Sequence, residues 1–302
     1  MLGFELRYNE EMNEVHIPVL LSDVIKYLRP SEGETYLDLT AGYGGHADKI
    51  LEVTRNYNGA VLNDRDQNAI NFLEAKYDKV KPKLMRDDFY STALRLAESG
   101  MRFDMILADF GVSSPQLDRG ERGFSFAKEA RLDMRMDESQ ELEAWTIVNK
   151  WSERKLADIF EQYAEERRGR AKLLAREICM NRPVETTTEL ADLIKSKSPY
   201  SHTHPATRIF QAIRIVVNDE LEIIEKTLPL LPKLLNPGGR VAIITFHSLE
   251  DRLIKEYFKD ESSKGLESTL RIITKKPIVA DKTEIVNNPR ARSAKLRVAE
   301  KI

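Results

Sequence analysis

The feature that most constrains the fold is an apolar segment that runs into a glycine-rich turn at residues 36–46. Tyr36-Leu37-Asp38-Leu39 has the character of a short buried strand, and Gly42-Tyr43-Gly44-Gly45-His46 opens a helix. Glycine lacks Cβ, so it adopts positive φ and lets backbone N–H groups approach a ligand at the positive end of the helix. The segment predicts a nucleotide-type cofactor site or, more simply, a tight strand-to-helix turn.

Two details indicate the kind of cofactor. The turn lacks the third glycine of the dinucleotide motif G-x-G-x-x-G, so NAD is not favoured. Asp38, near the end of the strand, is placed to face a cationic ligand. Asp64 ends a second apolar run about twenty residues after the glycines, where a carboxylate accepts hydrogen bonds from a ribose. The alternative role of Asp64, as N-cap of the next helix, suits Asp66 better. S-adenosylmethionine carries the cation and needs no phosphate site.

The composition sets broad limits. A chain of 302 residues with 41% hydrophobic content can bury the core of one large or two small domains. The net charge of −2 gives no overall nucleic-acid signature, but residues 264–302 hold ten Lys and Arg against four Asp and Glu, enough for phosphate contacts. The single Cys179 excludes an intramolecular disulfide and fits a reducing cytoplasm. The histidines form no ligand cluster, so no metal is expected.

The amino terminus has neither the basic start nor the apolar core of a signal peptide. No apolar run reaches membrane-spanning length, so we expect a cytoplasmic protein without a membrane partner. Met12 is an alternative start, and residues 1–11 are expected to form a loose extension.

Expected strands and helices alternate through the first third of the chain. The strands are 35–39, 60–64, 83–86 and 103–108, and the helices between them are 45–53, 67–77 and 90–99. This alternation predicts β-α-β units in a parallel sheet. A fifth strand is expected at 240–246, with two antiparallel strands near 270–274 and 295–299. The predicted fold class is α/β, Rossmann-like, with a doubly wound and mostly parallel sheet.

The alternation stops after the fourth strand. Between residues 115 and 204 the pattern shows amphipathic helices and loops without a convincing buried strand. We therefore expect an inserted helical subdomain at 115–204, which serves substrate recognition, within an α/β domain made of 1–114 and 205–302.

Acidic residues lie at the carboxyl ends of four of the expected parallel strands. They are Asp38, Asp64, the two aspartates of the Asp87-Asp88-Phe89 turn, and Asp109. Because ligands of such sheets gather at the carboxyl ends of the strands, these residues are expected to share one ligand-binding edge. Phe89 is placed there to pack on an adenine, or belongs to the ordinary core.

Several long motifs resemble one protein family. In chain order they are Gly44-Gly45-His46, Asp64-Arg65-Asp66, Gly111-Val112-Ser113-Ser114-Pro115-Gln116-Leu117-Asp118, Glu121-Arg122-Gly123-Phe124-Ser125-Phe126, Leu132-Asp133-Met134-Arg135-Met136-Asp137, His204-Pro205-Ala206-Thr207-Arg208, Phe246-His247-Ser248-Leu249-Glu250-Asp251-Arg252 and Asn288-Pro289-Arg290-Ala291-Arg292-Ser293. From residue 16 onward the chain is similar to the bacterial small-subunit ribosomal RNA cytosine-N4 methyltransferase H family.

The resemblance implies a class I S-adenosylmethionine-dependent methyltransferase fold. It implies methyl transfer to N4 of a cytidine in the decoding region of 16S rRNA, with naked rRNA or the assembled small subunit as partner. A homodimer is compatible with the sequence. The implied cofactor contacts are Gly44, Gly45, His46, Asp64, Phe89, Asp109 and Gln116. The chain departs from the family's usual residues at Leu39, Tyr43, Ala108 and Phe110, which affects the expected pocket shape.

The chemistry points to Asp109. Cytosine N4 is a weak nucleophile because its lone pair is delocalised, so a hydrogen-bond acceptor must localise that pair and align it with the methyl group. Asp109-Phe110-Gly111-Val112 matches only in part the Asp/Asn-Pro-Pro-aromatic motif common in amino-methyltransferases. Alternatively, Asp109 binds the amino group of the methionine moiety, while Ser113 or Ser114 faces the base.

Aromatic and basic residues are candidates for RNA contacts. An RNA base that leaves its stack is held by aromatic rings and edge hydrogen bonds. Phe124 and Phe126 are expected either to stack on that base or to pack the helical insert.

Two alternative functions remain. One is a non-catalytic ribosome-assembly factor. The other is an NAD-dependent oxidoreductase, which is disfavoured because the sequence lacks a Tyr-x-x-x-Lys pair.

Charged candidates also have two interpretations each. Arg135 can grip a phosphate or pair with Asp133. His247 follows the fifth strand at the ligand edge and is a substrate-site candidate, although a lone histidine is more often structural. Arg290 and Arg292 fit contacts with the RNA backbone, or are solvated surface charge.

Overall fold

The computed structural model describes residues 18–111, 122–198 and 204–302, which divide between two compact units. The first unit combines Met1–Phe110 with Leu228–Ile302, and the second is Gly111–Thr227. The helical unit thus extends beyond the expected end at residue 204. The reason is physical: the helix at Ala206–Asn218 buries its apolar face in the core of this unit.

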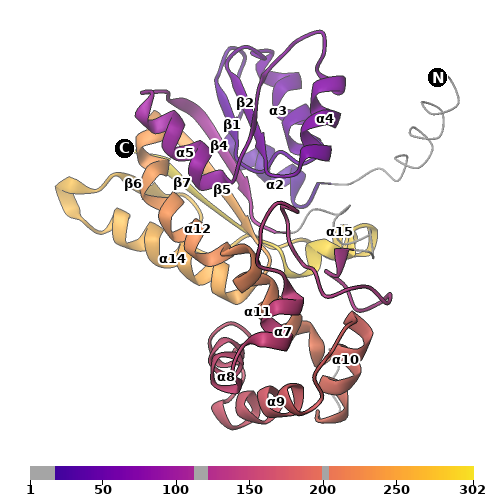
Figure 1. The fold of residues 1–302 in the computed structure, drawn as a ribbon. Coiled ribbons are helices and arrows are strands. Elements are labelled where there is room, and N and C mark those ends of the chain that lie inside the picture. The colour runs from indigo at the N-terminus through magenta and orange to yellow at the C-terminus, as the bar shows by residue number, and fades with distance from the viewer. Residues whose placement is uncertain (1–17, 112–121, 199–203) are drawn as a thin grey trace, which may run out of the picture. The chain divides into compact units, whose positions relative to one another are not determined.

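A seven-stranded sheet forms the centre of the first unit, in the order β3-β2-β1-β4-β5-β7-β6 (Figure 1). The strands are β1 (Tyr36–Asp38), β2 (Ala60–Asp64), β3 (Lys83–Arg86), β4 (Phe103–Asp109), β5 (Leu235–Thr245), β6 (Leu270–Ile272) and β7 (Lys295–Lys301). Strands β1 to β5 pair in parallel, whereas β7 is antiparallel to both β5 and β6. The predicted α/β class with a mostly parallel sheet is confirmed.

The direction of the chain across the sheet sets the helix layers. It moves outward from β1 to β3 and then returns to β4, so right-handed crossovers place α3 and α4 on one face and α5 on the other (Figure 1). The α-helices of this unit are α2 (Leu21–Leu28), α3 (Gly45–Thr54), α4 (Gln67–Lys76), α5 (Phe89–Glu98), α13 (Leu231–Leu234), α14 (Ser248–Ser262) and α15 (Lys282–Asn287). Three short 3₁₀ turns complete it: η2 (Leu228–Leu230), η3 (Gly265–Glu267) and η4 (Pro289–Ser293).

Aspartates that directly follow strands begin two of these helices. The side chain of Asp66 accepts the N–H of Asn68 at the start of α4, and Asp88 accepts the N–H of Ser91 at the start of α5, both at 2.9 Å. The predicted cap at Asp66 is confirmed. Because each cap lies within two residues of a strand end, the βα turns stay short and tight.

In its described residues, the second unit has six α-helices around a core of its own. They are α7 (Ala144–Lys150), α8 (Glu153–Gln162), α9 (Arg168–Met180), α10 (Thr187–Ser196), α11 (Ala206–Asn218) and α12 (Glu220–Thr227). Ser152 caps α8, and Thr186 with Glu189 forms a capping box at the start of α10. Apolar faces of α8, α9, α10 and α11 meet in one continuous cluster.

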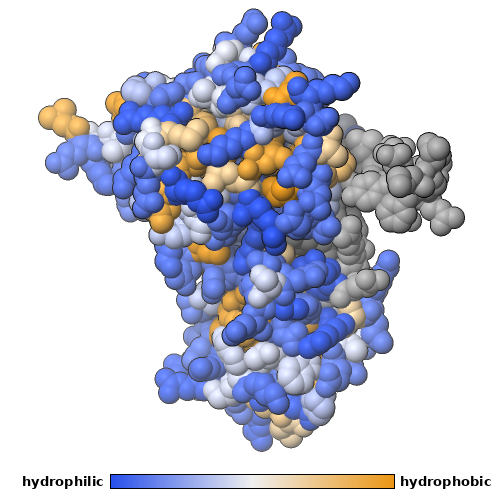
Figure 2. Space-filling view, turned by 45° about the horizontal axis from the view of Figure 1, so that its top comes forward, coloured by the Kyte–Doolittle hydropathy of each residue, from blue (hydrophilic) through white to orange (hydrophobic). Residues whose placement is uncertain are grey.

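On the face shown in Figure 2 most side chains are hydrophilic, and apolar side chains gather in its upper part. Among the described residues, no helix combines the length and the apolar character needed to cross a membrane.

Candidate active site

The glycine-rich turn is fixed by the carboxylate of Asp64. Gly42 and Gly44 adopt φ values of +53° and +78°, and Gly44 stands at the N-cap of α3 without a capping side chain. Asp64 Oδ2 accepts the backbone N–H of Gly42, and its Oδ1 accepts that of Asp66, both at 2.8 Å. Burial raises the pKa of Asp64 to about 6, although these hydrogen bonds favour the carboxylate. Asp64 therefore joins the turn to the end of β2.

Glycine is needed here for packing as well as for φ. A Cβ on Gly44 would lie 3.0 Å from Leu73 Cδ2, and a Cβ on Gly45 would lie 2.5 Å from Pro18 Cγ. Such a short contact forces a neighbour to shift. The tight-turn explanation for these glycines is therefore correct, and it does not exclude a ligand on the other side of the turn.

His46 points away from the edge into the protein. Its Nε2 lies 2.9 Å from the carbonyl oxygen of Val19, and the side chain is buried. Since a carbonyl only accepts, Nε2 carries the proton of this hydrogen bond. A contact from His46 to a cofactor would have to come from its backbone N–H at the start of α3, and this role stays a prediction.

Asn63 connects three loops of the edge, and the sequence analysis missed it. Its side-chain amide donates to the carbonyls of Leu39 (2.9 Å) and Asp87 (3.2 Å), and its Oδ1 accepts the hydroxyl of Thr92 (2.7 Å). The residue is 1% exposed. A polar side chain next to Asp64 in an otherwise apolar run was the signal that could have revealed it.

Asp38 is a structural residue in this arrangement and not a free acid at the edge. Its Oδ2 accepts the hydroxyl of Tyr36 at 2.7 Å, and its Oδ1 accepts the N–H of Thr40 at 3.1 Å. Burial raises the pKa of Asp38 to about 7, and the charge of Asp64 adds to this effect. The expectation that Asp38 faces a ligand does not match this position.

Asp109 carries the polar atom that most needs a partner. Its backbone N–H donates to Thr40 Oγ1 at 2.6 Å, but its carboxylate Oδ1 is buried without a hydrogen bond among the described residues. Burial raises the pKa of Asp109 to about 8, with smaller contributions from Asp38 and Glu250. An unsatisfied buried acceptor costs about 1–3 kcal/mol, so a donor or a cation bound here would be stabilised.

Two aromatic rings lie beside this carboxylate. The ring centroids of Phe89, the first residue of α5, and Phe110, which follows Asp109, are 4.9 Å apart. Phe110 is buried, so the partly exposed Phe89 that packs on it offers the apolar surface, which suits one face of an adenine.

His247 begins α14 at the carboxyl end of β5. Its Nδ1 accepts the N–H of Glu250 at 3.3 Å, while Glu250 Oε2 accepts the backbone N–H groups of Phe246 and His247. Because Nδ1 accepts, the neutral ring carries its proton on Nε2. That atom is 3.1 Å from Glu250 Oε1 but makes no hydrogen bond in the described structure, since distance alone does not align the two groups.

The residues of the second unit that are predicted to contact RNA make contacts within the unit itself. Phe124 is 8% exposed within the core, and the ring of Phe126 lies 4.6 Å from His204 and 5.1 Å from Phe210. The guanidinium of Arg135 is held on two sides. It donates through Nε and Nη2 to Asp133, at 2.8 Å each, and through Nη1 to two backbone carbonyls. Contact of Phe124 with a base, or of Arg135 with a phosphate, would require these interactions to change.

Other predicted residues fall elsewhere. Arg290 and Arg292 lie in η4 of the first unit, and Arg292 is exposed. Ser113 and Gln116 lie outside the described residues. The structure gathers seven predicted residues at the carboxyl edge of the sheet: Gly44, Gly45, His46, Asp64, Phe89, Asp109 and His247.

The strand order with one reversed strand, the glycine turn and the acids at the carboxyl edge define a class I methyltransferase fold. The chain belongs to the MraW methylase family, whose profile matches residues 13–302. It is 47% identical over 298 residues to the ribosomal RNA small subunit methyltransferase H of Trichormus variabilis, covering 97% of this chain and 93% of that protein.

A second relative spans the whole chain. The ribosomal RNA small subunit methyltransferase H of Synechocystis is 44% identical over 314 residues and covers 100% of this chain and 98% of its own length. Among solved structures, TrmN from Thermus thermophilus is similar at 13% identity and a TM-score of 0.44, covering 94% of this chain and 48% of that one. The assignment to the family rests on the sequence matches.

Proposed function

We propose that this methylase transfers the methyl group of S-adenosylmethionine to N4 of a cytidine in the decoding region of 16S rRNA. The observation that carries the proposal is the buried, unpartnered Oδ1 of Asp109, at the end of β4. The names of the two relatives support ribosomal RNA of the small subunit as the substrate.

The residues of the edge fit this cofactor. Asp64 already accepts one hydrogen bond on each carboxylate oxygen, and the remaining lone pairs suit the hydroxyls of a ribose. Phe89, packed on the buried ring of Phe110, offers an apolar surface for the adenine. When bound, S-adenosylmethionine supplies a methyl group on a positively charged sulfur, and the acids at this edge attract that charge.

Asp109 has two proposed roles. With a pKa of about 8, its carboxyl group is mostly protonated near neutral pH in this structure. A cation beside it favours the carboxylate, and a carboxylate can accept a hydrogen bond from the N4 amine and hold it in line. Alternatively, the same carboxylate binds the amino group of the methionine moiety. The Asp109→Asn variant separates these roles, because the first mainly affects kcat and the second mainly affects cofactor Kd.

The second unit is proposed to recognise the RNA. Its role, together with those of Phe126, His247 and Arg292, is supported by aromatic or basic character and by the family's motifs. We further propose that the protein acts in the cytoplasm, on naked rRNA or on an assembled small subunit, and that Ser113 and Gln116 contribute to the site.

The direct test is transfer of a labelled methyl group to naked 16S rRNA and, in parallel, to small subunits purified from a deletion strain. We expect labelled N4-methylcytidine in one of the two substrates. Mass spectrometry of rRNA nucleosides provides the cellular counterpart, and an unchanged amount of N4-methylated cytidine in the deletion strain would refute the proposal. An assembly factor would instead bind RNA without transferring the label.

A further inference from the structure

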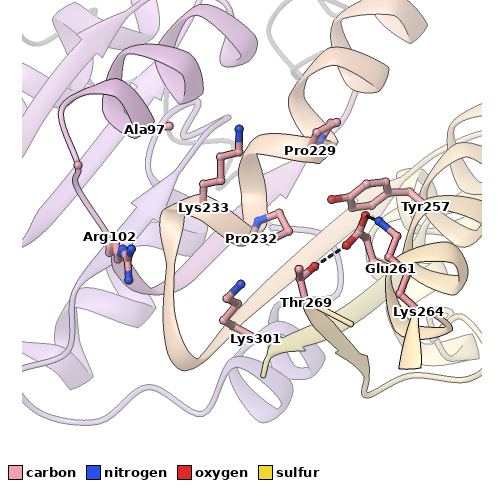
Figure 3. A pocket seen from close by; sticks show the side chains of 11 residues that line it. Ala97, Arg102, Pro229, Pro232, Lys233, Tyr257, Glu261, Lys264, Thr269 and Lys301 are labelled. Carbon is pink, nitrogen blue, oxygen red and sulfur yellow. Dashed lines mark hydrogen bonds and ion pairs between the residues drawn. The ribbon is translucent and has the colours of Figure 1, made fainter. Parts of the chain in front are cut away.

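A cavity of about 600 Å³ lies in the first unit at the amino edge of the sheet, opposite the glycine turn (Figure 3). Its lining comes from segments that precede strands. Arg102 precedes β4, Lys233 precedes β5 and Thr269 precedes β6. Lys301 ends the antiparallel strand β7 and so reaches the same edge. The cavity is therefore separate from the carboxyl edge where the methyl donor is proposed to bind.

Positive charge predominates in this cavity. Glu261 accepts hydrogen bonds from Lys264 Nζ and from Thr269 Oγ1, both at 2.5 Å, so its charge already has a counterion (Figure 3). The side chains of Arg102, Lys233 and Lys301 make no hydrogen bond or ion pair with any residue in the described ranges, although Lys301 is close enough to influence the pKa of Glu261. Three cations from three different segments thus line one cavity without an ion pair of their own among the described residues.

Neighbouring acids at this edge form no ion pair with these cations in the described structure. Glu300 is paired with Arg240 at 2.9 Å and with Arg271. Asp104 is engaged by hydrogen bonds from the neutral groups of Thr35 and Asn236. Like charges in a concave site with low-dielectric walls concentrate a positive potential, which attracts anions.

We propose that this cavity binds the phosphate of a nucleotide, with Arg102, Lys233 and Lys301 around the phosphate and Tyr257 against the base. The volume lies within the usual range for small-ligand pockets. Arg and Lys are the common phosphate ligands, and an aromatic ring beside basic groups is the usual arrangement for holding an unstacked nucleotide. The nucleotide comes from solution or from an RNA strand; its assignment to RNA rests on the proposed function.

The test uses the full-length protein and three probes: uridine monophosphate, a short oligouridylate and inorganic phosphate. Uracil has no N4 amine, so these probes do not act as methyl acceptors. The Lys233→Gln/Lys301→Gln variant is expected to bind uridine monophosphate and the oligouridylate roughly five- to tenfold more weakly than the wild type. For the oligouridylate, the slope of log K against log salt should fall by about 1.4, because two phosphate contacts are lost.

A matched control removes the same charge elsewhere. Lys79 and Lys83 are exposed at the amino edge near β3, the strand farthest from β6 in the sheet, and Lys79→Gln/Lys83→Gln should bind the probes as the wild type does. Equal affinities of the cavity variant and this control for every probe would overturn the proposal. Weakening with the oligouridylate alone identifies an RNA strand as the source, and weakening with the monophosphate alone identifies a free nucleotide.

Two further measurements complete the test. Tyr257→Leu should weaken the binding of uridine monophosphate but leave the binding of inorganic phosphate unchanged. An equal effect on the binding of both would show that Tyr257 is not part of the proposed site. S-adenosylmethionine affinity should be the same in the wild type and the cavity variant. If the wild type transfers no methyl group to rRNA while the cavity variant still loses nucleotide affinity, the proposed function fails and the nucleotide site stands.

Discussion

Asp64 Oδ2 accepts a hydrogen bond of 2.8 Å from the backbone N–H of Gly42, a residue 22 positions earlier in the chain. This contact joins two consecutive βα junctions, so the position of the glycine turn depends on a single carboxylate. A carboxylate has about four acceptor positions, so Asp64 keeps capacity for a hydrogen bond from a cofactor hydroxyl.

Replacing Asp64 should therefore affect both ligand binding and stability. Asp64→Ala is expected to weaken S-adenosylmethionine binding by about 10- to 100-fold and to lower the free energy of unfolding by about 1–2 kcal/mol. Calorimetric titration and urea denaturation measure the two effects. The control is Asp66→Ala, which removes the side-chain cap of α4. It should lower the free energy of unfolding by about 1 kcal/mol but leave the affinity for S-adenosylmethionine unchanged. Equal losses of affinity in both variants would exclude a direct role for Asp64.

The pH dependence of stability should report on Asp109. Its pKa is about 8 in the folded protein and 3.8 for the ordinary group, so the folded state holds the proton more strongly. The resulting stability is fully present below about pH 4 and is lost as pH rises through about 8. Asp109→Asn carries no such charge, so it should be more stable than the wild type near pH 9, by about 1–3 kcal/mol. Parallel curves of Tm against pH for the two proteins would contradict this assignment.

Cofactor binding should release protons from the same group. A cation beside Asp109 lowers its pKa, so binding of S-adenosylmethionine at about pH 7 is expected to expel part of a proton. Calorimetry in two buffers with different ionisation enthalpies measures the number of protons released on binding. S-adenosylhomocysteine lacks the sulfonium charge but keeps the amino group, so it should release less if Asp109 faces the sulfur and the same amount if Asp109 binds the amino group. Identical proton release for the wild type and Asp109→Asn would show that another group is responsible.

His247 offers a way to separate a capping role from a role in the reaction. His247→Ala removes the side-chain cap of α14 and should cost about 1 kcal/mol of stability, whereas His247→Asn keeps a good capping group. If Nε2 contacts the substrate, both variants lose methyl transfer at least tenfold while only the alanine variant loses stability. Full activity of His247→Asn would assign His247 to the cap alone.

Gly45 tests the packing of the turn. Gly45→Ala places a Cβ 2.5 Å from Pro18 Cγ and is expected to cost about 1–3 kcal/mol in the free energy of unfolding. Gly169→Ala, in α9, meets nothing within 4 Å and should be neutral or stabilising by up to about 1 kcal/mol. Denaturant titrations of the two variants provide the comparison, and similar stabilities would show that Pro18 yields to the added methyl group.

Several elements could be predicted because their causes are local. The strand at residues 60–64 and the caps at Asp66, Ser152 and Thr186 depend on residues within a few positions of one another. Other features depend on contacts between distant segments. Asn63 owes its role to carbonyls of two other strand ends and a hydroxyl of α5, which no local pattern contains. The extent of the helical unit likewise depends on where α11 buries its apolar face.

The sequence by itself determined the order of strands and helices, the parallel sheet and the family, because periodicity, caps and motifs are written along the chain. The tertiary structure decided which of the acids at the carboxyl edge is satisfied. Asp38 is held by Tyr36 and Thr40, whereas Asp109 keeps a buried oxygen without a partner. Burial and hydrogen bonding set the charge of these groups, and both arise only when separate strands are brought side by side.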